Sequence, residues 1–329
     1  MISFFRNCWF LTGPTAGGKS DVAIALARRI DAEILSLDSM AVYRGLDIGT
    51  AKPTPAQRQA VLHHLLDLVS PEQDFSVAQY VDAAREAAGG ILARGRTPLF
   101  VGGSPLYLKA LLRGLFAGPP ADWPLRRELE ETARRDGSSQ LHARLAEVDP
   151  AAAARLHPND TRRLIRALEV HLQMGQPISG LQQEFAVAHA ASDGRVFVLD
   201  WPRDVLQRRI DARVEVMFAA GWVEEVHRFL ESGQTLSRTA SQAVGYREIV
   251  EHLAGGPNLA DTVSRIQQRT RQFAKRQLTW FRSLSECRWI AVAEPINPAA
   301  VAEKIAAAGE CLMSNDECLK NDEGPNDEK

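Results

Sequence analysis

Residues 13–20, GPTAGGKS, combine residue types and spacing that are suited to binding phosphate. They satisfy the pattern GxxxxGK[ST], in which a glycine-rich backbone presents N–H groups to phosphate oxygens and the lysine supplies a cation. The pattern lies between an apolar segment and an amphipathic helix, whose N-terminus also favours an anion. A glycine-rich turn that binds nothing is the alternative. We expect a phosphate site made of Gly13, Pro14, Thr15, Ala16, Gly17, Gly18, Lys19 and Ser20, with Mg²⁺ as cofactor and Ser20 as its ligand.

Polar residues also follow two other expected strands. Asp38 comes directly after residues 32–37, and Ser104 follows a strand that ends in the sequence VGGS. The carboxyl ends of parallel strands form the edge of the sheet where ligands bind. Asp38 suits a general base or an outer ligand of Mg²⁺, and Ser104 suits a contact to phosphate or to a base. As alternatives, either residue only caps the turn or helix that follows it.

The pattern of apolar residues predicts the elements that position these groups. We expect strands at residues 3–11, 32–37, 65–69, 98–101, 195–199 and 288–292, and helices at 21–30, 76–93, 260–284 and 298–308. Strands that alternate with helices are typical of a parallel sheet covered on both faces. The predicted fold class is therefore α/β, a P-loop NTPase-like parallel sheet flanked by helices.

This alternation stops after residue 115. The next segment has helical patterns at residues 125–135, 141–148 and 161–174 and no clear strand, which indicates an all-helical domain inserted into the sheet domain. We assign residues 1–117 and 190–310 to a discontinuous P-loop core and residues 118–189 to a helical insertion. Residues 311–329 carry seven acids and two lysines when Glu310 is counted with them, and we expect a disordered acidic tail there.

The composition narrows the class of protein. With 45% hydrophobic and 24% charged residues, the 329-residue chain has enough apolar side chains for a core. No apolar run reaches the roughly 18 residues that a membrane-spanning helix needs, so no membrane partner is expected. The four cysteines form no CxxC pair, which fits the reducing cytoplasm.

One expected helix is strongly basic. Residues 260–284 carry Arg265, Arg269, Arg271, Lys275, Arg276 and Arg282, and no acid occurs between residues 262 and 285. Such a surface suits a polyanion, although a solvated helix face is the simpler alternative. Three arginines at the start of the helix at 161–174 also oppose the helix dipole, which hints at an external anion.

Taken together, the sequence resembles the tRNA dimethylallyltransferase (tRNA isopentenyltransferase) family in its bacterial form. The resemblance covers about residues 10–292 and rests on the motifs GPTAGGKS, SLDSMAVYRGLDIGTAKPT, HHLLDLV, LFVGGSPLYLKALL, HPNDTRRLIRALEV, AVGYREI and RQFAKRQLTWFR. It implies a prenyltransferase that moves a dimethylallyl group from dimethylallyl diphosphate to N6 of the adenosine immediately 3′ of the anticodon. The tRNAs implied are those reading codons that begin with U.

The resemblance also assigns roles to individual residues. Asp38 would accept the proton of the flipped-out adenine, Lys19 and Ser104 would assist catalysis, and Arg213 would join the P-loop in binding diphosphate. The anticodon stem-loop of tRNA would be contacted by the helical insertion at 118–189 and by residues of several motifs. These are Asp38, Ser39, Met40, Ala41, Ser104, Arg126, Arg162, Arg163, Leu164, Ile165, Arg166, Gln242, Ala243, Val244, Gly245, Tyr246, Arg247, Lys275 and Arg276.

Two other functions remain open from the residues alone. A small-molecule P-loop kinase would use Lys19, Ser20 and Asp38 equally well, but it leaves the basic helix without a role. A nucleotide-switched RNA-binding protein would use the P-loop without catalysing a reaction on RNA. The leading expectation is a monomeric, cytoplasmic tRNA prenyltransferase.

Overall fold

The computed structural model describes residues 2–116, 118–181 and 195–321 of the chain. The chain forms two compact units, one made of Met1–Leu112 and Ala190–Lys329 and the other of Arg113–His189. The sequence analysis placed the first junction after residue 117. Residues 182–189 of the expected insertion and 322–329 of the expected tail lie outside the described residues.

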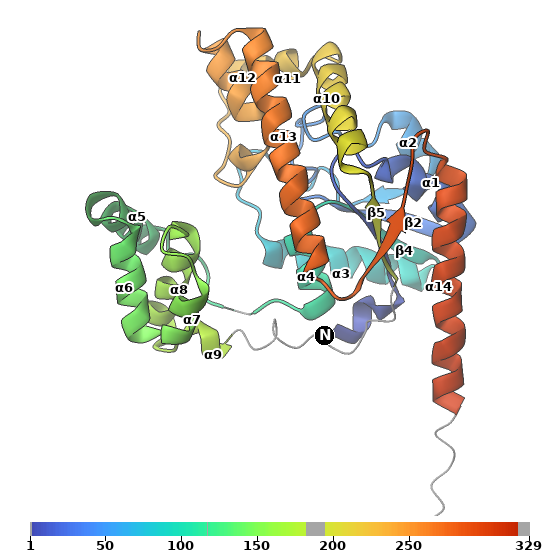
Figure 1. Cartoon of the computed structure of the whole chain (residues 1–329), viewed down its shortest axis with the longest axis horizontal. Helices are drawn as coiled ribbons and strands as arrows, with labels where there is room; N and C mark the ends of the chain where they lie inside the picture. The colour runs from blue at the N-terminus through green and yellow to red at the C-terminus, as the bar shows by residue number, and fades with distance from the viewer. Residues whose placement is uncertain (1, 117, 182–194, 322–329) are drawn as a thin grey trace, which may run out of the picture. The chain divides into compact units, whose positions relative to one another are not determined.

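The larger unit is built on a six-stranded sheet in which all the paired strands are parallel (Figure 1). Its strands are β1 (Trp9–Thr12), β2 (Ala32–Leu37), β3 (His63–His64), β4 (Thr97–Gly102), β5 (Val196–Asp200) and β6 (Cys287–Ala291). They are ordered β3-β2-β4-β1-β5-β6. This order confirms the predicted α/β parallel fold and places the carboxyl end of β1 at the point where the strand order reverses, where such folds bind ligands.

Helices complete the larger unit. They are α1 (Lys19–Arg29), α2 (Pro55–Ala60), α3 (Val77–Ala93), α4 (Pro105–Arg113), α10 (Arg203–Ala219), α11 (Trp222–Glu231), α12 (Tyr246–Leu253), α13 (Leu259–Arg282) and α14 (Pro298–Asn321). Helices α1 and α14 pack against each other, and Leu26 and Ile305 join Leu11 of β1 in the core. Ser76 caps α3 as predicted, because its side chain accepts the N–H of Gln79.

Two predicted strands differ from the structure. Residues Ile2–Asn7 form a 3-10 helix, and the ring of Phe5 packs edge-on against Phe100. The apolar character of this segment thus reflects packing against the sheet. The third strand is His63–His64, because Leu65 and Asp67 adopt positive φ angles of 62° and 57° that a strand cannot contain.

The C-terminal helix is longer than predicted. Helix α14 continues to Asn321, whereas the sequence analysis ended it at residue 308 and expected a disordered tail from 311. No proline interrupts residues 299–324, and the segment 310–320 contains good helix formers among its acids. The acidic composition therefore did not prevent helix formation in residues 311–321.

The described residues of the smaller unit form helices and their connecting loops, and no strand. It contains α5 (Trp123–Asp136), α6 (Ser138–Val148), α7 (Pro150–Arg155), α8 (Thr161–Met174) and α9 (Ile178–Leu181). Its own core includes Leu129, Leu145, Leu164 and Leu168. Among the described helices of both units, none combines the length and apolar character needed to cross a membrane.

Candidate active site

The phosphate loop joins β1 to α1 in a tightly turned conformation. Gly13 and Gly18 adopt φ angles of 146° and 76°, and Ala16 adopts 60°, which is uncommon for a residue with a side chain. The Lys19 ammonium donates to the carbonyls of Gly13 at 3.0 Å and Pro14 at 2.7 Å. Lys19 is thus folded back over the loop at the N-terminus of α1.

Side chains that follow the insertion in sequence hold this loop from outside. Trp201 Nε1 donates to the Gly17 carbonyl at 3.0 Å, and Arg209 Nε donates to the Ala16 carbonyl at 3.0 Å. The Arg209 guanidinium also lies 4.3 Å from the centre of the Trp201 ring, a cation-π contact. Both residues therefore hold the loop carbonyls in place.

Two cations and a carboxylate share the interior of the site. Burial, together with the nearby charge of Arg213, lowers the pKa of Lys19 to about 7, although Asp38 opposes this shift. Burial also lowers the pKa of Arg213, while Asp38 acts to raise it. Two positive groups held near each other repel, which raises the free energy of the charged forms of Lys19 and Arg213. A bound anion would therefore stabilise both charges.

Asp38 lies in a turn at the end of β2. Its Oδ1 accepts the N–H of Met40 at 2.8 Å, so part of the carboxylate does cap the turn. Within the described residues its other oxygen, Oδ2, has no hydrogen-bond partner and is available to a ligand. The capping and functional interpretations of Asp38 are thus compatible.

Ser104 supports the same turn from the end of β4. Its Oγ accepts the Ser39 N–H at 2.9 Å and lies 3.3 Å from the Ser39 hydroxyl. Because this side chain bonds to Ser39, the alternative in which Ser104 only caps α4 is not supported. The structure therefore brings together Lys19, Asp38 and Ser104, the three predicted catalytic residues.

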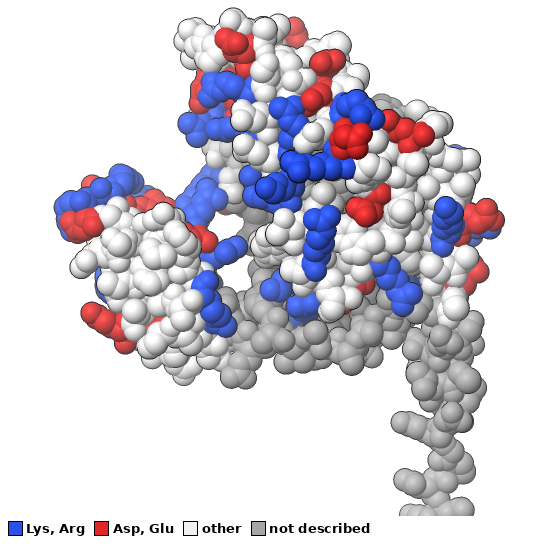
Figure 2. All heavy atoms as spheres, viewed as in Figure 1, with Lys and Arg blue, Asp and Glu red and all other residues white. Residues whose placement is uncertain are grey.

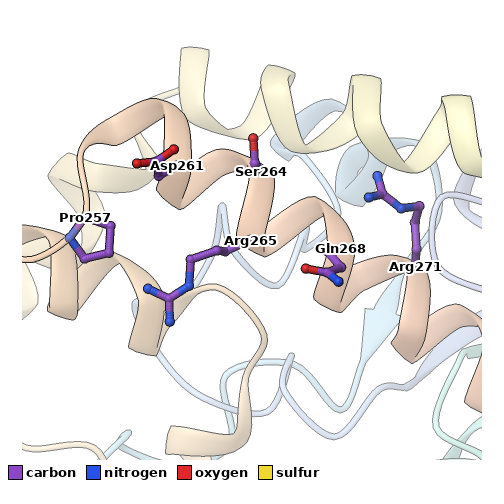
Figure 3. Close-up of a pocket in the computed structure, with 6 residues that line it drawn as sticks. All are labelled: Pro257, Asp261, Ser264, Arg265, Gln268 and Arg271. Carbon is purple, nitrogen blue, oxygen red and sulfur yellow. The ribbon is translucent and has the colours of Figure 1, made fainter.

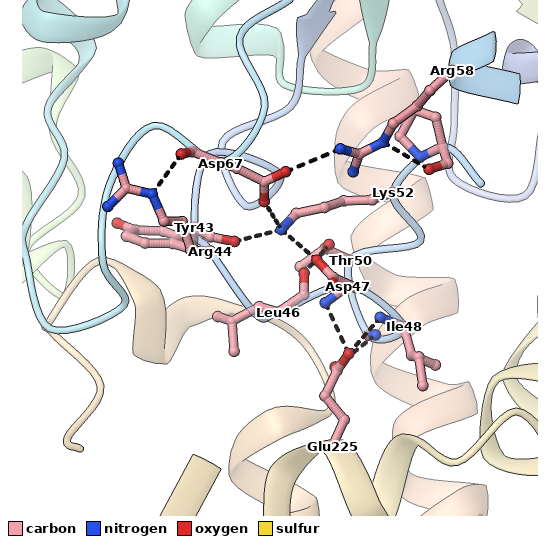
Figure 4. A network of polar contacts seen from close by, with 12 residues as sticks. Tyr43, Arg44, Leu46, Asp47, Ile48, Thr50, Lys52, Arg58, Asp67 and Glu225 are labelled. Carbon is pink, nitrogen blue, oxygen red and sulfur yellow. Dashed lines mark hydrogen bonds and ion pairs between the residues drawn. The ribbon is translucent and has the colours of Figure 1, made fainter. Parts of the chain in front are cut away.

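A buried lysine organises the loop that follows Asp38 (Figure 4). The side chain of Lys52 is 2% exposed and donates to the Tyr43 carbonyl at 2.5 Å, to Asp47 at 2.6 Å and to Asp67 at 2.5 Å. A buried ammonium is tolerated only when its donors are paired in this way. Lys52 thereby joins the segment that contains Tyr43 and Asp47 to Asp67.

The same loop is held by α11. Glu225 accepts the backbone N–H groups of Asp47 at 2.9 Å and Ile48 at 2.7 Å (Figure 4). It also accepts a hydrogen bond of 2.7 Å from the Tyr246 hydroxyl. Successive backbone N–H groups form a concave anion site. Here a carboxylate of the chain itself occupies that site, so the backbone of Asp47 and Ile48 has a structural role.

Several residues predicted to contact tRNA have inward-facing side chains. Ala41, Leu164, Ile165, Ala243 and Tyr246 are each at most 5% exposed. A side chain added at Gly245 would lie 2.1 Å from the Trp222 ring, so this glycine is a close-packing position. The side chains of these five residues thus pack in the cores of the two units, and Gly245 allows the close approach of Trp222. A contact of these six positions with tRNA stays a prediction.

Arg126 and Arg166, two further predicted tRNA contacts, bind a buried carboxylate. Glu169 is fully buried on α8 and accepts two bonds of 2.7 Å from Arg126 and one of 2.6 Å from Arg166. Burial raises the pKa of the Glu169 carboxyl, but the hydrogen bonds of the two arginines outweigh it and hold the pKa below its usual range. The two arginines therefore have a structural role in the insertion.

We predict that Glu169→Gln destabilises the insertion unit by about 3 kcal/mol near neutral pH, because it leaves two partly buried arginines without a counter-charge. The pKa of Glu169 is lower in the folded chain, so the stabilisation is present above the unfolded pKa and is lost as the pH falls through the folded value. Thermal unfolding at several pH values measures this. The exposed Glu128→Gln on α5 is the matched control, and an equal effect of both variants would contradict the prediction.

The basic residues of α13 divide into two groups. An open pocket on its first half is lined by Pro257, Asp261, Ser264, Arg265, Gln268 and Arg271 (Figure 3). Arg271 pairs with Asp211 of α10, Arg265 pairs with Glu251, and Arg269 pairs with Glu248. The interpretation that no acid offsets this helix is therefore wrong for its first half, because the acids come from neighbouring helices.

The second half of α13 remains a basic surface. A groove is lined there by Gln272, Lys275, Arg276, Thr279 and Trp280, and Lys and Arg side chains gather along α13 in Figure 2. Within the described part of the chain, no ion pair is found for Lys275 or Arg276. Among the other residues predicted to contact tRNA, four are exposed, namely Arg162, Arg163, Gln242 and Arg247. Ser39, Met40 and Val244 are half-buried.

The sequence analysis did not identify the residues whose hydrogen bonds hold the loops of the site, among them Trp201, Arg209, Glu225 and Lys52. It also missed Gln277, for which a signal existed. Gln277 lies four residues from both Phe273 and Phe281, which places a polar side chain on the apolar face of the predicted helix. A polar residue there needs buried partners.

The phosphate loop lies at the carboxyl end of β1, and the Asp38 carboxylate interacts electrostatically with Lys19 of this loop and with Arg213, both of which are partly buried. These features define an α/β P-loop protein with an anion site near a candidate proton acceptor. Comparison with known families gives a more specific assignment. The sequence profile described as IPP transferase matches residues 41–284, and the profile described as isopentenyl transferase matches residues 6–69. The chain belongs to the IPP transferase family.

Individual relatives agree with this assignment. A tRNA dimethylallyltransferase of Rhodopirellula baltica is 46% identical over 318 residues, which cover 94% of this chain and 95% of the relative. One of Geobacter metallireducens is 48% identical and covers 84% and 90%. The crystal structure of a tRNA isopentenylpyrophosphate transferase from Bacillus halodurans has a TM-score of 0.67 and 35% identity, covering 94% of this chain and 98% of the other.

Proposed function

We propose that this chain transfers a dimethylallyl group from dimethylallyl diphosphate to N6 of the adenosine immediately 3′ of the anticodon, in tRNAs that read codons beginning with U. The tRNA dimethylallyltransferases among its relatives support this reaction. The observation that carries the proposal is that the Asp38 carboxylate, at the carboxyl end of β2, is near enough to Lys19 and Arg213 to act on the charge of both, which brings a proton acceptor to the anion site.

In this reaction the adenine N6 attacks the allylic carbon of the donor. The new C–N bond forms as the C–O bond breaks, and the electron pair of the C–O bond leaves with the diphosphate. Asp38 Oδ2 accepts the proton that N6 loses. Lys19, Arg213 and the loop N–H groups stabilise the growing negative charge of the leaving group.

Mg²⁺ fits this arrangement as a cofactor. Ser20 is exposed at the start of α1, beside the loop N–H groups, and offers a hydroxyl oxygen of the kind that hard cations bind. Ser20 would hold the ion. Bound Mg²⁺ would neutralise part of the diphosphate charge.

The tRNA partner is supported by the basic surface of α13. Lys275 and Arg276 present unneutralised charge to an RNA backbone, and Trp280 lies in the same groove. The exposed arginines Arg162, Arg163 and Arg247 are further candidates. We infer a cytoplasmic monomer that takes the anticodon stem-loop as its macromolecular substrate.

We predict that Arg276→Glu weakens tRNA binding and lowers the slope of log affinity against log salt concentration by about one for each phosphate that is no longer neutralised. Binding titrations at several salt concentrations measure both quantities. Arg208→Glu is the control, because Arg208 is an exposed arginine of α10 paired with Asp204. Equal effects of the two reversals would mean that α13 offers no specific RNA surface.

A direct assay tests the proposed reaction. The purified chain is incubated with Mg²⁺, unmodified tRNA whose anticodon ends in A, and isotope-labelled dimethylallyl diphosphate, and digested RNA is analysed by mass spectrometry. Label on adenosine at the position 3′ of the anticodon is expected. Absence of label, together with consumption of ATP in a parallel incubation to which ATP is added, would overturn the proposal in favour of a P-loop kinase.

A further inference from the structure

Gln277 joins two loops of the site through a buried amide. It lies on α13, is 3% exposed, accepts the Thr15 N–H on Oε1 at 2.9 Å and donates from Nε2 to the Gly103 carbonyl at 2.6 Å. The orientation of the amide is determined, since an N–H only donates and a carbonyl only accepts. Both polar ends of this side chain are therefore paired with backbone.

The loops approach so closely that little besides this amide fits between them. A side chain added at Gly103 would lie 2.4 Å from Gln277 Nε2 and 3.3 Å from the Gly13 carbonyl oxygen. The β4 loop, the phosphate loop and α13 thus meet at one point. The length of the Gln277 side chain sets the separation of the two loops there.

The β4 loop, which Gln277 contacts at Gly103, leads to the turn that carries the proton acceptor Asp38. Gly103 precedes Ser104, whose Oγ accepts the Ser39 N–H at 2.9 Å, directly beside Asp38. A continuous path of hydrogen bonds and backbone therefore connects Thr15 of the phosphate loop to the turn that carries Asp38. Gln277 is its middle link.

We propose that Gln277 is a positioning residue that fixes the phosphate loop relative to the turn of Ser104 and Asp38. The catalytic part of this inference rests on the proposed transfer reaction. Gln277 acts through Thr15 and Gly103, so it sets the distance between the allylic carbon and the proton acceptor without touching either substrate.

Two substitutions separate the bonds made by Gln277. Gln277→Met keeps the length of the side chain but leaves the Thr15 N–H and the Gly103 carbonyl unpaired, and Gln277→Glu keeps an acceptor for Thr15 while losing the donor to Gly103. We expect both variants to lower kcat by roughly 10²-fold, the effect of a displacement of about 1 Å at a reacting centre, with the KM for tRNA unchanged. Gln277→Met, which adds no charge, should also weaken binding of inorganic diphosphate by about tenfold.

The exposed Gln268 on the same helix supplies the matched controls Gln268→Met and Gln268→Glu. Unfolding curves establish the folded fraction of each variant. A kcat and a diphosphate affinity at wild-type level in folded Gln277→Met would overturn the positioning role. If the wild-type chain transfers no dimethylallyl group, the proposed function fails, and the diphosphate affinity of Gln277→Met still decides whether Gln277 holds the phosphate loop.

Discussion

The Asp38→Asn variant should bind tRNA like the wild type and transfer the dimethylallyl group about 10²- to 10⁴-fold more slowly, the usual loss when a general base is removed. Asparagine keeps an oxygen for the Met40 N–H, so the turn at the end of β2 is preserved. What is lost is the ability of Oδ2 to take a proton from N6. Asp38→Ala should lose transfer as well, with tRNA affinity nearly intact.

Single-turnover transfer rates and tRNA binding titrations measure the two properties separately. Asp31→Asn is the matched control, since Asp31 is an exposed carboxylate just before the other end of β2, where it pairs with Arg96. Rapid turnover in Asp38→Asn would remove this carboxylate from the base role. A parallel loss of tRNA affinity would instead point to a role in substrate binding.

Lys19→Met should lower kcat by about 10²- to 10³-fold, as expected when one group that stabilises the charged transition state is removed. It should also change the proton balance of diphosphate binding. In the free chain the pKa of Lys19 is about 7, and a bound anion raises it because the anion favours the charged ammonium. The contribution of Lys19 to diphosphate affinity is therefore complete below pH 7 and decreases as the pH rises above 7, until the pH exceeds the pKa of Lys19 in the bound state.

Calorimetry of inorganic diphosphate binding at pH 8, in two buffers with different ionisation enthalpies, gives the number of protons taken up. Wild type should take up more protons than Lys19→Met, whose side chain cannot ionise. Arg28→Met, at an exposed position of the same helix, should match the wild type. Identical proton uptake by the wild type and Lys19→Met would show that Lys19 is already charged in the free chain.

The groups that carry the chemistry were predictable from local sequence. A phosphate loop needs a strand, a glycine-rich turn and a helix in immediate succession, and residues 9–29 supply all three. Asp38 and Ser104 were found for a related reason, because a polar residue that directly follows a buried parallel strand must lie at the binding edge of the sheet.

The partners of charged residues were not predictable in the same way. The acids that neutralise Arg265, Arg269 and Arg271 are distant in sequence or lie on other helices, so the count of charge along α13 missed them. Arg126 and Arg166 look like RNA ligands in sequence, but tertiary packing brings both onto Glu169. Motif resemblance alone did not separate residues of the core from residues of the surface.

The strand order constrains when the site can form during synthesis. Strand β1 pairs with β4, which precedes the insertion, and with β5, which follows it. A nascent chain that has not yet passed residue 195 exposes one unpaired edge of β1, which is a hazard for aggregation. Such a chain contains the whole GxxxxGKS sequence but lacks Arg213 and Gln277. Prematurely terminated chains would therefore contain the phosphate-binding sequence motif but lack residues that complete the site in the folded protein.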